Sequence, residues 1–263
     1  MSEQYNMHMN NLPIGIFDSG LGGLTVVKEI VKRLPNEDII YLGDTARVPY
    51  GTRSRKTVQK FSLQDARFLL KKRVKCIVIA CNTSSALAGD YLKKKIKLPV
   101  FDVITPAIDT AKEVSKNGTI GVIGTKGTVK SGAYKVKYSK ACPLFVPFIE
   151  EGETSSEALK IIAKEYLSKF KGKIDTLILG CTHYPIIKKT ISEELDKNVV
   201  LVDPGKSTAL EIERYLRENK MLNSQKRKGK TQYFVTDLTE GFFKVAEMFL
   251  GKRIKDNLKQ TVL

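Results

Sequence analysis

Residues 77–83 read Ile-Val-Ile-Ala-Cys-Asn-Thr, and residues 177–183 read Leu-Ile-Leu-Gly-Cys-Thr-His. In each stretch an apolar run leads into a cysteine, and polar residues follow it. Short apolar runs of this kind are typical of strands buried on both faces of a parallel sheet. The two stretches therefore predict a repeated α/β unit with a cysteine at the end of one strand.

The repeat extends to both sides of the cysteines. Residues 14–20 read Ile-Gly-Ile-Phe-Asp-Ser-Gly and residues 120–125 read Ile-Gly-Val-Ile-Gly-Thr, while Asp102 and Asp203 each end a later strand-like run. We expect an α/β protein with two similar domains of mainly parallel strands, related by a pseudo-twofold, with the site in the cleft between them. Residues 1–103 with 210–263 would form the first domain and residues 104–209 the second.

Apolar, β-branched runs alternate with helix-period segments along the whole chain. The expected strands are residues 14–17, 38–42, 76–80, 100–103, 120–123, 144–148, 176–180, 199–202 and 233–236. A helix is expected over 154–170, where Thr154 and Glu157 have the spacing of a capping box.

Composition excludes several classes of protein. The chain has 263 residues, 42% of them hydrophobic, and no apolar run approaches the roughly 20 residues that span a bilayer. The N-terminus lacks the basic and apolar regions of a signal peptide. We expect a cytoplasmic protein with reduced thiols and no membrane partner. The four cysteines form no CxxC pair, so neither a disulfide framework nor a metal site is indicated.

The chain is strongly basic, with 45 Lys and Arg against 28 Asp and Glu and a net charge of +17. Such a balance suits a nucleic acid or a small anionic substrate. The cations lie in short runs among acids, without the interleaved aromatic residues that stack on bases. We therefore do not expect nucleic-acid binding as the main function.

Cys81 and Cys181 are the strongest candidates for chemistry. Ligands of parallel sheets bind at the carboxyl ends of strands, where both cysteines are predicted to lie. A thiol at a helix N-terminus has a lowered pKa, whereas a buried thiol such as Cys76 or Cys142 is usually inert. Two thiols facing one cavity suit the inversion of an α-carbon, because one face needs a base and the other an acid.

Other polar segments complete the predicted site. After the first strand we place Asp18 beside Cys81 and Ser19 on the ligand, although a plain glycine-rich turn is the alternative. The Pro49–Tyr50–Gly51–Thr52 segment could present backbone N–H groups to a carboxylate, or be a surface turn.

The corresponding loop of the second unit contributes Thr125 and Thr128. His183 is expected to support Cys181. Glu150 is its candidate partner, although Glu150 and Glu151 could equally be a solvated pair.

Together these motifs resemble the glutamate racemases of the aspartate/glutamate racemase group. The resemblance runs from about Leu12 to the C-terminus and rests on residues 15–26, 43–51, 80–83 and 179–185, with lesser matches at 104–107 and 202–205.

The resemblance implies interconversion of L- and D-glutamate without a cofactor, and supply of D-glutamate for peptidoglycan. We also expect the protein to be a homodimer. It implies that Cys81 is the base for D-glutamate, assisted by Asp18, and Cys181 the base for L-glutamate, assisted by His183, with Glu150 a looser match. It also implies a set of substrate-holding residues, namely Ser19, Tyr50, Gly51, Asn82, Thr83 and Thr182.

Two alternatives remain at this stage. A racemase of another acid, such as aspartate, would use the same chemistry, whereas a related decarboxylase needs only one acid and so does not explain both cysteines. A redox-active thiol protein would instead work through a disulfide or a sulfenate at these cysteines.

Overall fold

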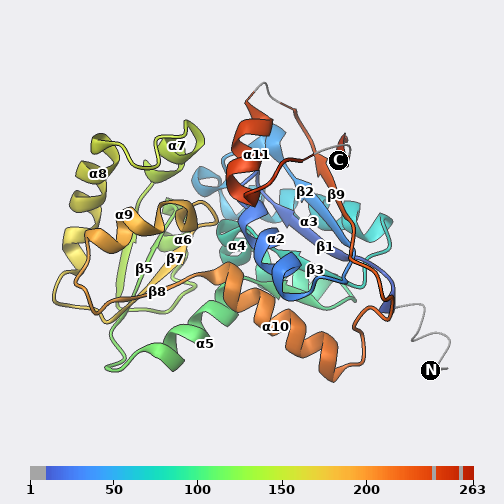
Figure 1. Cartoon of the computed structure of the whole chain (residues 1–263), viewed down its shortest axis with the longest axis horizontal. Helices are drawn as coiled ribbons and strands as arrows, with labels where there is room; N and C mark the ends of the chain where they lie inside the picture. Colours follow the sequence, from blue (N-terminus) through green and yellow to red (C-terminus); the bar gives the residue numbers. More distant parts are fainter. Residues whose placement is uncertain (1–9, 239–240, 255–256) are drawn as a thin grey trace.

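Two parallel β-sheets form the framework of the protein (Figure 1). The computed structural model describes residues 10–238, 241–254 and 257–263. One sheet has six strands in the order β10-β9-β2-β1-β3-β4, and the other has four in the order β6-β5-β7-β8. Every pairing between neighbouring strands is parallel. The predicted α/β class with parallel sheets is therefore confirmed.

The two sheets share a common core of four strands. The order β2-β1-β3-β4 in the first matches β6-β5-β7-β8 in the second, and Ile14 pairs with Cys76 as Ile120 pairs with Thr176. The repeat seen in the sequence is thus a structural repeat. The strands are β1 (Ile14–Asp18), β2 (Ile39–Gly43), β3 (Cys76–Ile79), β4 (Val100–Asp102), β5 (Ile120–Gly124), β6 (Tyr138–Ala141), β7 (Thr176–Gly180), β8 (Val200–Val202), β9 (Thr231–Val235) and β10 (Leu258–Gln260).

Helices cover both faces of the six-stranded sheet. Side chains alternate along β1, so Ile14 and Ile16 pack in one apolar cluster and Phe17 in another. The first cluster includes residues of α2 (Leu24–Arg33), α10 (Pro204–Glu218) and α11 (Phe242–Leu250). The second includes residues of α3 (Arg55–Lys71) and α4 (Asn82–Lys95). This packing buries both faces of the sheet.

The smaller sheet has its own helices. These are α5 (Ile104–Val114), α6 (Lys126–Ser131), α7 (Phe145–Glu150), α8 (Glu157–Leu167) and α9 (Lys188–Glu193). Among the residues described, no helix is both long and apolar enough to cross a membrane.

The predicted strand at residues 144–148 is wrong, because this segment forms α7. Phe145 and Ile149 are both fully buried and lie four residues apart, which is a helical spacing. Pro147 falls in the first turn, where no backbone N–H is needed for the helix. The strand that pairs with β5 is β6 instead. It was missed because all four of its residues are only half-buried, so no apolar run marks it.

Two helix starts also differ from expectation. Ser156, not Thr154, caps α8, and its hydroxyl accepts the N–H of Leu159 at 3.3 Å. Cys181 does not begin an α-helix as Cys81 does, because a turn and the short 3₁₀ helix η4 (Tyr184–Ile187) follow it. Each cysteine therefore follows the corresponding strand of its own sheet, but only Cys81 begins an α-helix.

Candidate active site

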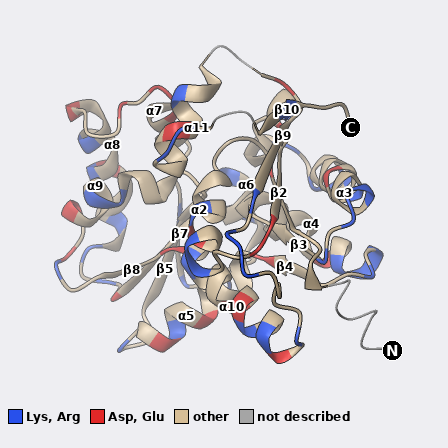
Figure 2. Cartoon of the chain, turned by 45° about the vertical axis from the view of Figure 1, so that its right-hand side comes forward, with Lys and Arg blue, Asp and Glu red and all other residues tan. Residues whose placement is uncertain are grey.

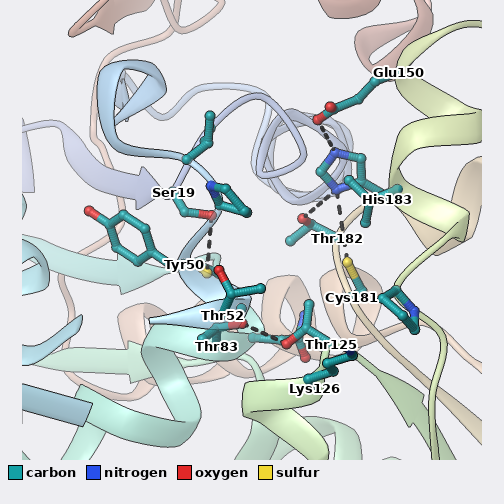
Figure 3. Close-up of a pocket in the computed structure, with 18 of the residues that line it drawn as sticks. Ser19, Tyr50, Thr52, Thr83, Thr125, Lys126, Glu150, Cys181, Thr182 and His183 are labelled. Carbon is teal, nitrogen blue, oxygen red and sulfur yellow. Dashed lines mark hydrogen bonds and ion pairs between the residues drawn. The ribbon is translucent and has the colours of Figure 1, made fainter. Parts of the chain in front are cut away.

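Both predicted cysteines line one cavity of about 300 Å³ at the carboxyl ends of the two sheets (Figure 3). Cys81 follows β3 and Cys181 follows β7, which are corresponding strands. The lining residues come from both halves of the chain, and they are Ser19, Gly20, Val48, Pro49, Tyr50, Gly51, Thr52, Cys81, Asn82, Thr83, Thr125, Lys126, Pro143, Val146, Pro147, Glu150, Cys181, Thr182 and His183.

The two halves are in close contact beside the cavity. A Cβ atom on Gly22 would lie 2.2 Å from Thr182 Oγ1 and 2.5 Å from the His183 ring, so only glycine allows this approach. The hydroxyl of Thr25 donates to the Thr182 carbonyl at 2.8 Å. The start of α2 thereby fixes the turn that carries Cys181.

Cys81 caps α4 with its sulfur. The N–H of Ser84 donates to Sγ at 3.4 Å, and the thiol donates to Ser19 Oγ at the same distance. Burial raises the pKa of the Cys81 thiol to about 11, and the charge of Asp18 acts in the same direction. The expected lowering of this pKa by the helix N-terminus is therefore wrong, because desolvation of the thiolate outweighs the helix.

Asp18 ends β1 and is buried behind the cavity wall rather than on it. One carboxylate oxygen accepts the N–H of Gly20 at 3.0 Å, whereas Oδ1 has no hydrogen-bond partner among the described residues. Burial raises the pKa of Asp18, although the charge of His183 opposes the shift. A buried carboxylate oxygen without a donor is well suited to accept a proton.

Cys181 has a different set of neighbours. Its sulfur lies 3.9 Å from His183 Nδ1, and His183 Nε2 lies 2.9 Å from Glu150 Oε1, as the dashed lines in Figure 3 show. Burial alone would lower the pKa of His183, but the hydrogen bonds to Cys181 and Glu150 outweigh it and raise the pKa to about 10. A protonated imidazole beside Cys181 can donate a hydrogen bond to its sulfur.

The Pro49–Tyr50–Gly51 segment forms one wall through its backbone. The Tyr50 hydroxyl donates to Asp44 and, at 3.1 Å, to Asp65. In Figure 3 this hydroxyl points away from the other labelled side chains. Because the phenol is engaged elsewhere, the backbone is the part of this segment that can meet a ligand.

Hydroxyl and amide groups line the adjoining wall, where Gly51 packs directly against Thr125. Thr83 Oγ1 and Thr125 Oγ1 are 2.9 Å apart, and the Asn82 side-chain oxygen accepts the Tyr134 hydroxyl at 2.5 Å. Thr128 is almost fully buried and does not line the cavity. Its hydroxyl lies 3.0 Å from that of Thr125, so it supports the wall from behind.

Sequence reasoning missed part of the lining. Lys126 is the one lysine among the described lining residues, and it follows directly after the predicted Thr125. Thr52, by contrast, ends the predicted segment 49–52 and does line the cavity. The apolar lining at Val48, Pro143, Val146 and Pro147 had no signal in the sequence, because apolar residues are predicted as core by default.

Residues 14–212 match the family model described as Asp/Glu/Hydantoin racemase. The chain belongs to this family. It is 46% identical over 254 residues to the glutamate racemase of Geobacter metallireducens, covering 92% of this chain and 94% of that protein.

Solved structures of racemases in this family have the same fold. The glutamate racemase of Francisella tularensis, solved in complex with D-glutamate, is 47% identical with a TM-score of 0.90, covering 96% of this chain and 98% of that one. The Escherichia coli glutamate racemase, solved with L-glutamate and the activator UDP-MurNAc-ala, is 26% identical with a TM-score of 0.71, covering 91% and 94%.

Proposed function

We propose that the protein is a glutamate racemase that moves the α-proton of glutamate between Cys81 and Cys181. The observation that carries the proposal is the shared cavity, which two thiols line from corresponding positions of two related sheets. Family membership and the close, nearly full-length glutamate racemases support the assignment.

The proposed reaction uses one thiol as base and the other as acid. From D-glutamate, the Cys81 thiolate takes the α-proton, and the Cys181 thiol delivers a proton to the opposite face of the carbanion. The product is L-glutamate, with Cys81 as thiol and Cys181 as thiolate. The reverse reaction exchanges the roles, so no net proton is consumed.

Each base has its own assistant in this proposal. The Cys81 thiol has a pKa of about 11, so it needs an acceptor for its proton, and the unpartnered oxygen of Asp18 is the acceptor that we assign. His183, with a pKa of about 10, is cationic at neutral pH and stabilises a Cys181 thiolate, while Glu150 orients its ring.

The cavity offers fixed partners for a dicarboxylate. We assign substrate contacts to Ser19, Asn82, Thr83, Thr125 and Thr182 and to the backbone of residues 49–51, with Thr128 behind them. Lys126 adds a cation at the wall. Polar groups placed for a distal carboxylate remain unpaired when that group is missing, which predicts discrimination against glutamine and aspartate.

Several wider assignments go beyond the site itself. We propose a cytoplasmic homodimer whose D-glutamate enters peptidoglycan. We also keep the division into residues 1–103 with 210–263 and residues 104–209. Sheet membership supports that division, since β5 to β8 fall in the second range and the other strands in the first. Residues 1–9 lie outside the described residues.

The decisive experiment offers single enantiomers to the purified protein. L- and D-glutamate, aspartate and glutamine are incubated without added cofactor, before and after dialysis against a chelator, and optical rotation is followed. We expect glutamate alone to racemise at a high rate. Comparable turnover of aspartate would contradict the substrate, and activity restored only by pyridoxal phosphate or a metal would contradict the mechanism.

A further inference from the structure

Positive charge is concentrated in one part of the chain. Residues 53–97 contain thirteen of the 45 Lys and Arg but only two of the 28 Asp and Glu. This segment forms α3, β3 and α4, and the blue side of α3 in Figure 2 lies at the outer edge of the molecule. This segment, with thirteen cations and two acids, therefore accounts for +11 of the net charge of +17.

Four of these cations form a straight row along α3. Lys56, Lys60, Arg67 and Lys71 are exposed and fall within about 60° of one another around the helix axis, over about 22 Å. Within the described parts of the chain, Lys56, Lys60 and Arg67 have no carboxylate within ion-pair distance. Unpaired like charges in a row repel each other, so a bound anion would stabilise them.

The row borders a groove that is separate from the active site. Its lining comes from α3, with Lys56, Lys60 and Arg67, and from Tyr91 of α4. The groove is a shallow hollow of about 550 Å³. Tyr91 is 24 residues from the nearest of these cations in the sequence, and the packing of α3 on α4 brings its ring into the same groove.

We propose that this groove binds the phosphodiester backbone of a nucleic acid. A row of lysine and arginine side chains matches a linear polyanion, because each cation can neutralise one phosphate and release its counterion. Tyr91 supplies one ring on which an unpaired base can stack. The contacts carry no sequence information, so the groove is a non-specific site for DNA or RNA.

Two other occupants fit the surface less well. A membrane-binding helix needs large apolar side chains beside its cations, and none of the exposed large hydrophobic residues among those described lies on α3 or α4. A folded protein partner needs a large apolar centre to its interface, and the groove provides only Leu63 and Tyr91 for this among mostly polar residues. A polyanion such as a nucleic acid needs only the cations and the aromatic ring that line the groove.

The test measures binding of the full-length protein to fluorescent 30-mers of single-stranded DNA, duplex DNA and RNA by anisotropy between 50 and 300 mM NaCl. We expect the logarithm of affinity to fall with the logarithm of salt with a slope of about −2 to −4, as three or four phosphate contacts require. Lys56→Gln/Lys60→Gln/Arg67→Gln should remove most of that slope. Tyr91→Ala should weaken binding to single strands more than to duplex.

The matched control removes the same charge elsewhere. Lys112→Gln/Lys116→Gln/Lys171→Gln changes three exposed lysines around the smaller sheet. It should retain the slope, and both triple variants should racemise glutamate at the wild-type rate. Equal losses in the two triple variants, absence of binding at 100 mM NaCl, or tighter binding to vesicles of anionic lipid than to any nucleic acid would overturn the proposal.

Discussion

The two cysteines occupy the same position in two related sheets, yet their surroundings differ. Cys81 begins a 14-residue α-helix and lies near the buried Asp18. Cys181 begins no α-helix and contacts the His183–Glu150 pair instead. The repeat fixed where each thiol lies, whereas the residues around it determine how each thiol gains or loses a proton.

The difference can be traced to two positions of the repeat. Asp18 ends β1, and the corresponding residue at the end of β5 is Gly124. His183 lies two residues after Cys181, and the corresponding residue after Cys81 is Thr83. Each half has thus one titratable assistant, but from a different loop. The two cysteines therefore occupy equivalent positions, but a different residue assists each of them. This difference suits a chiral substrate, which presents different groups to the two halves of the cavity.

The largest expected effect comes from removing either thiol. Cys81→Ser and Cys181→Ser should each lower racemisation by at least about 10²- to 10⁴-fold, because serine is not ionised near neutral pH. In deuterated water, Cys81→Ser should retain washout of the α-proton from L-glutamate, and Cys181→Ser from D-glutamate.

Cys142→Ser is the control, since Cys142 does not line the cavity. It should retain exchange from both enantiomers. Equal residual exchange from both enantiomers in either active-site variant would refute the assignment of one thiol to each face.

The next largest effect is expected from replacing the two assisting residues, Asp18 and His183, while both thiols stay in place. Asp18→Asn should slow abstraction from D-glutamate, and His183→Asn abstraction from L-glutamate, each by about 10²-fold. The measurement is the same exchange assay, and each variant is the control for the other. If both variants slow both enantiomers equally, the two halves are not independent.

A smaller effect is expected at Glu150, which is half-exposed. Its hydrogen bond helps to raise the pKa of His183 to about 10. Because the folded-state pKa lies above the ordinary value, the pair stabilises the protein fully below about pH 6.5, and this stabilisation is lost as the pH rises through about 10. Glu150→Gln should therefore lower Tm at pH 6 more than at pH 10.

The neighbouring Glu151→Gln is the matched control, because Glu151 is exposed and makes no ion pair among the described residues. It should leave Tm unchanged at both pH values. A Tm difference for Glu150→Gln that does not shrink towards pH 10 would show that Glu150 acts by packing rather than by charge.

The smallest effect on chemistry is expected at Tyr50, whose hydroxyl bridges two buried carboxylates. Tyr50→Phe leaves Asp44 and Asp65 without this donor and should cost about 1–3 kcal/mol of unfolding free energy. It should raise KM more than it lowers kcat, since the loop holds substrate and not the proton. Tyr138→Phe, on the edge strand β6, is the control and should change neither the unfolding free energy nor KM. A fall in kcat alone in Tyr50→Phe would show instead that the phenol takes part in proton transfer.

The sequence by itself determined the strands with continuous apolar runs and the loops that follow them. Both cysteines, Ser19, Asn82 and Thr182 could be placed at strand ends because burial of a parallel strand leaves a local pattern. The strand ends of parallel sheets meet at one edge, so these residues were expected to share a cavity, and they do.

Only the tertiary structure decided what each of these groups experiences. The raised pKa of Cys81 and the engagement of the Tyr50 phenol with Asp65 both depend on residues that are not neighbours in sequence. Desolvation and Coulomb interaction are sums over neighbours in space. A local sequence pattern predicts which residues are buried, but it does not predict which residues they contact in the folded protein.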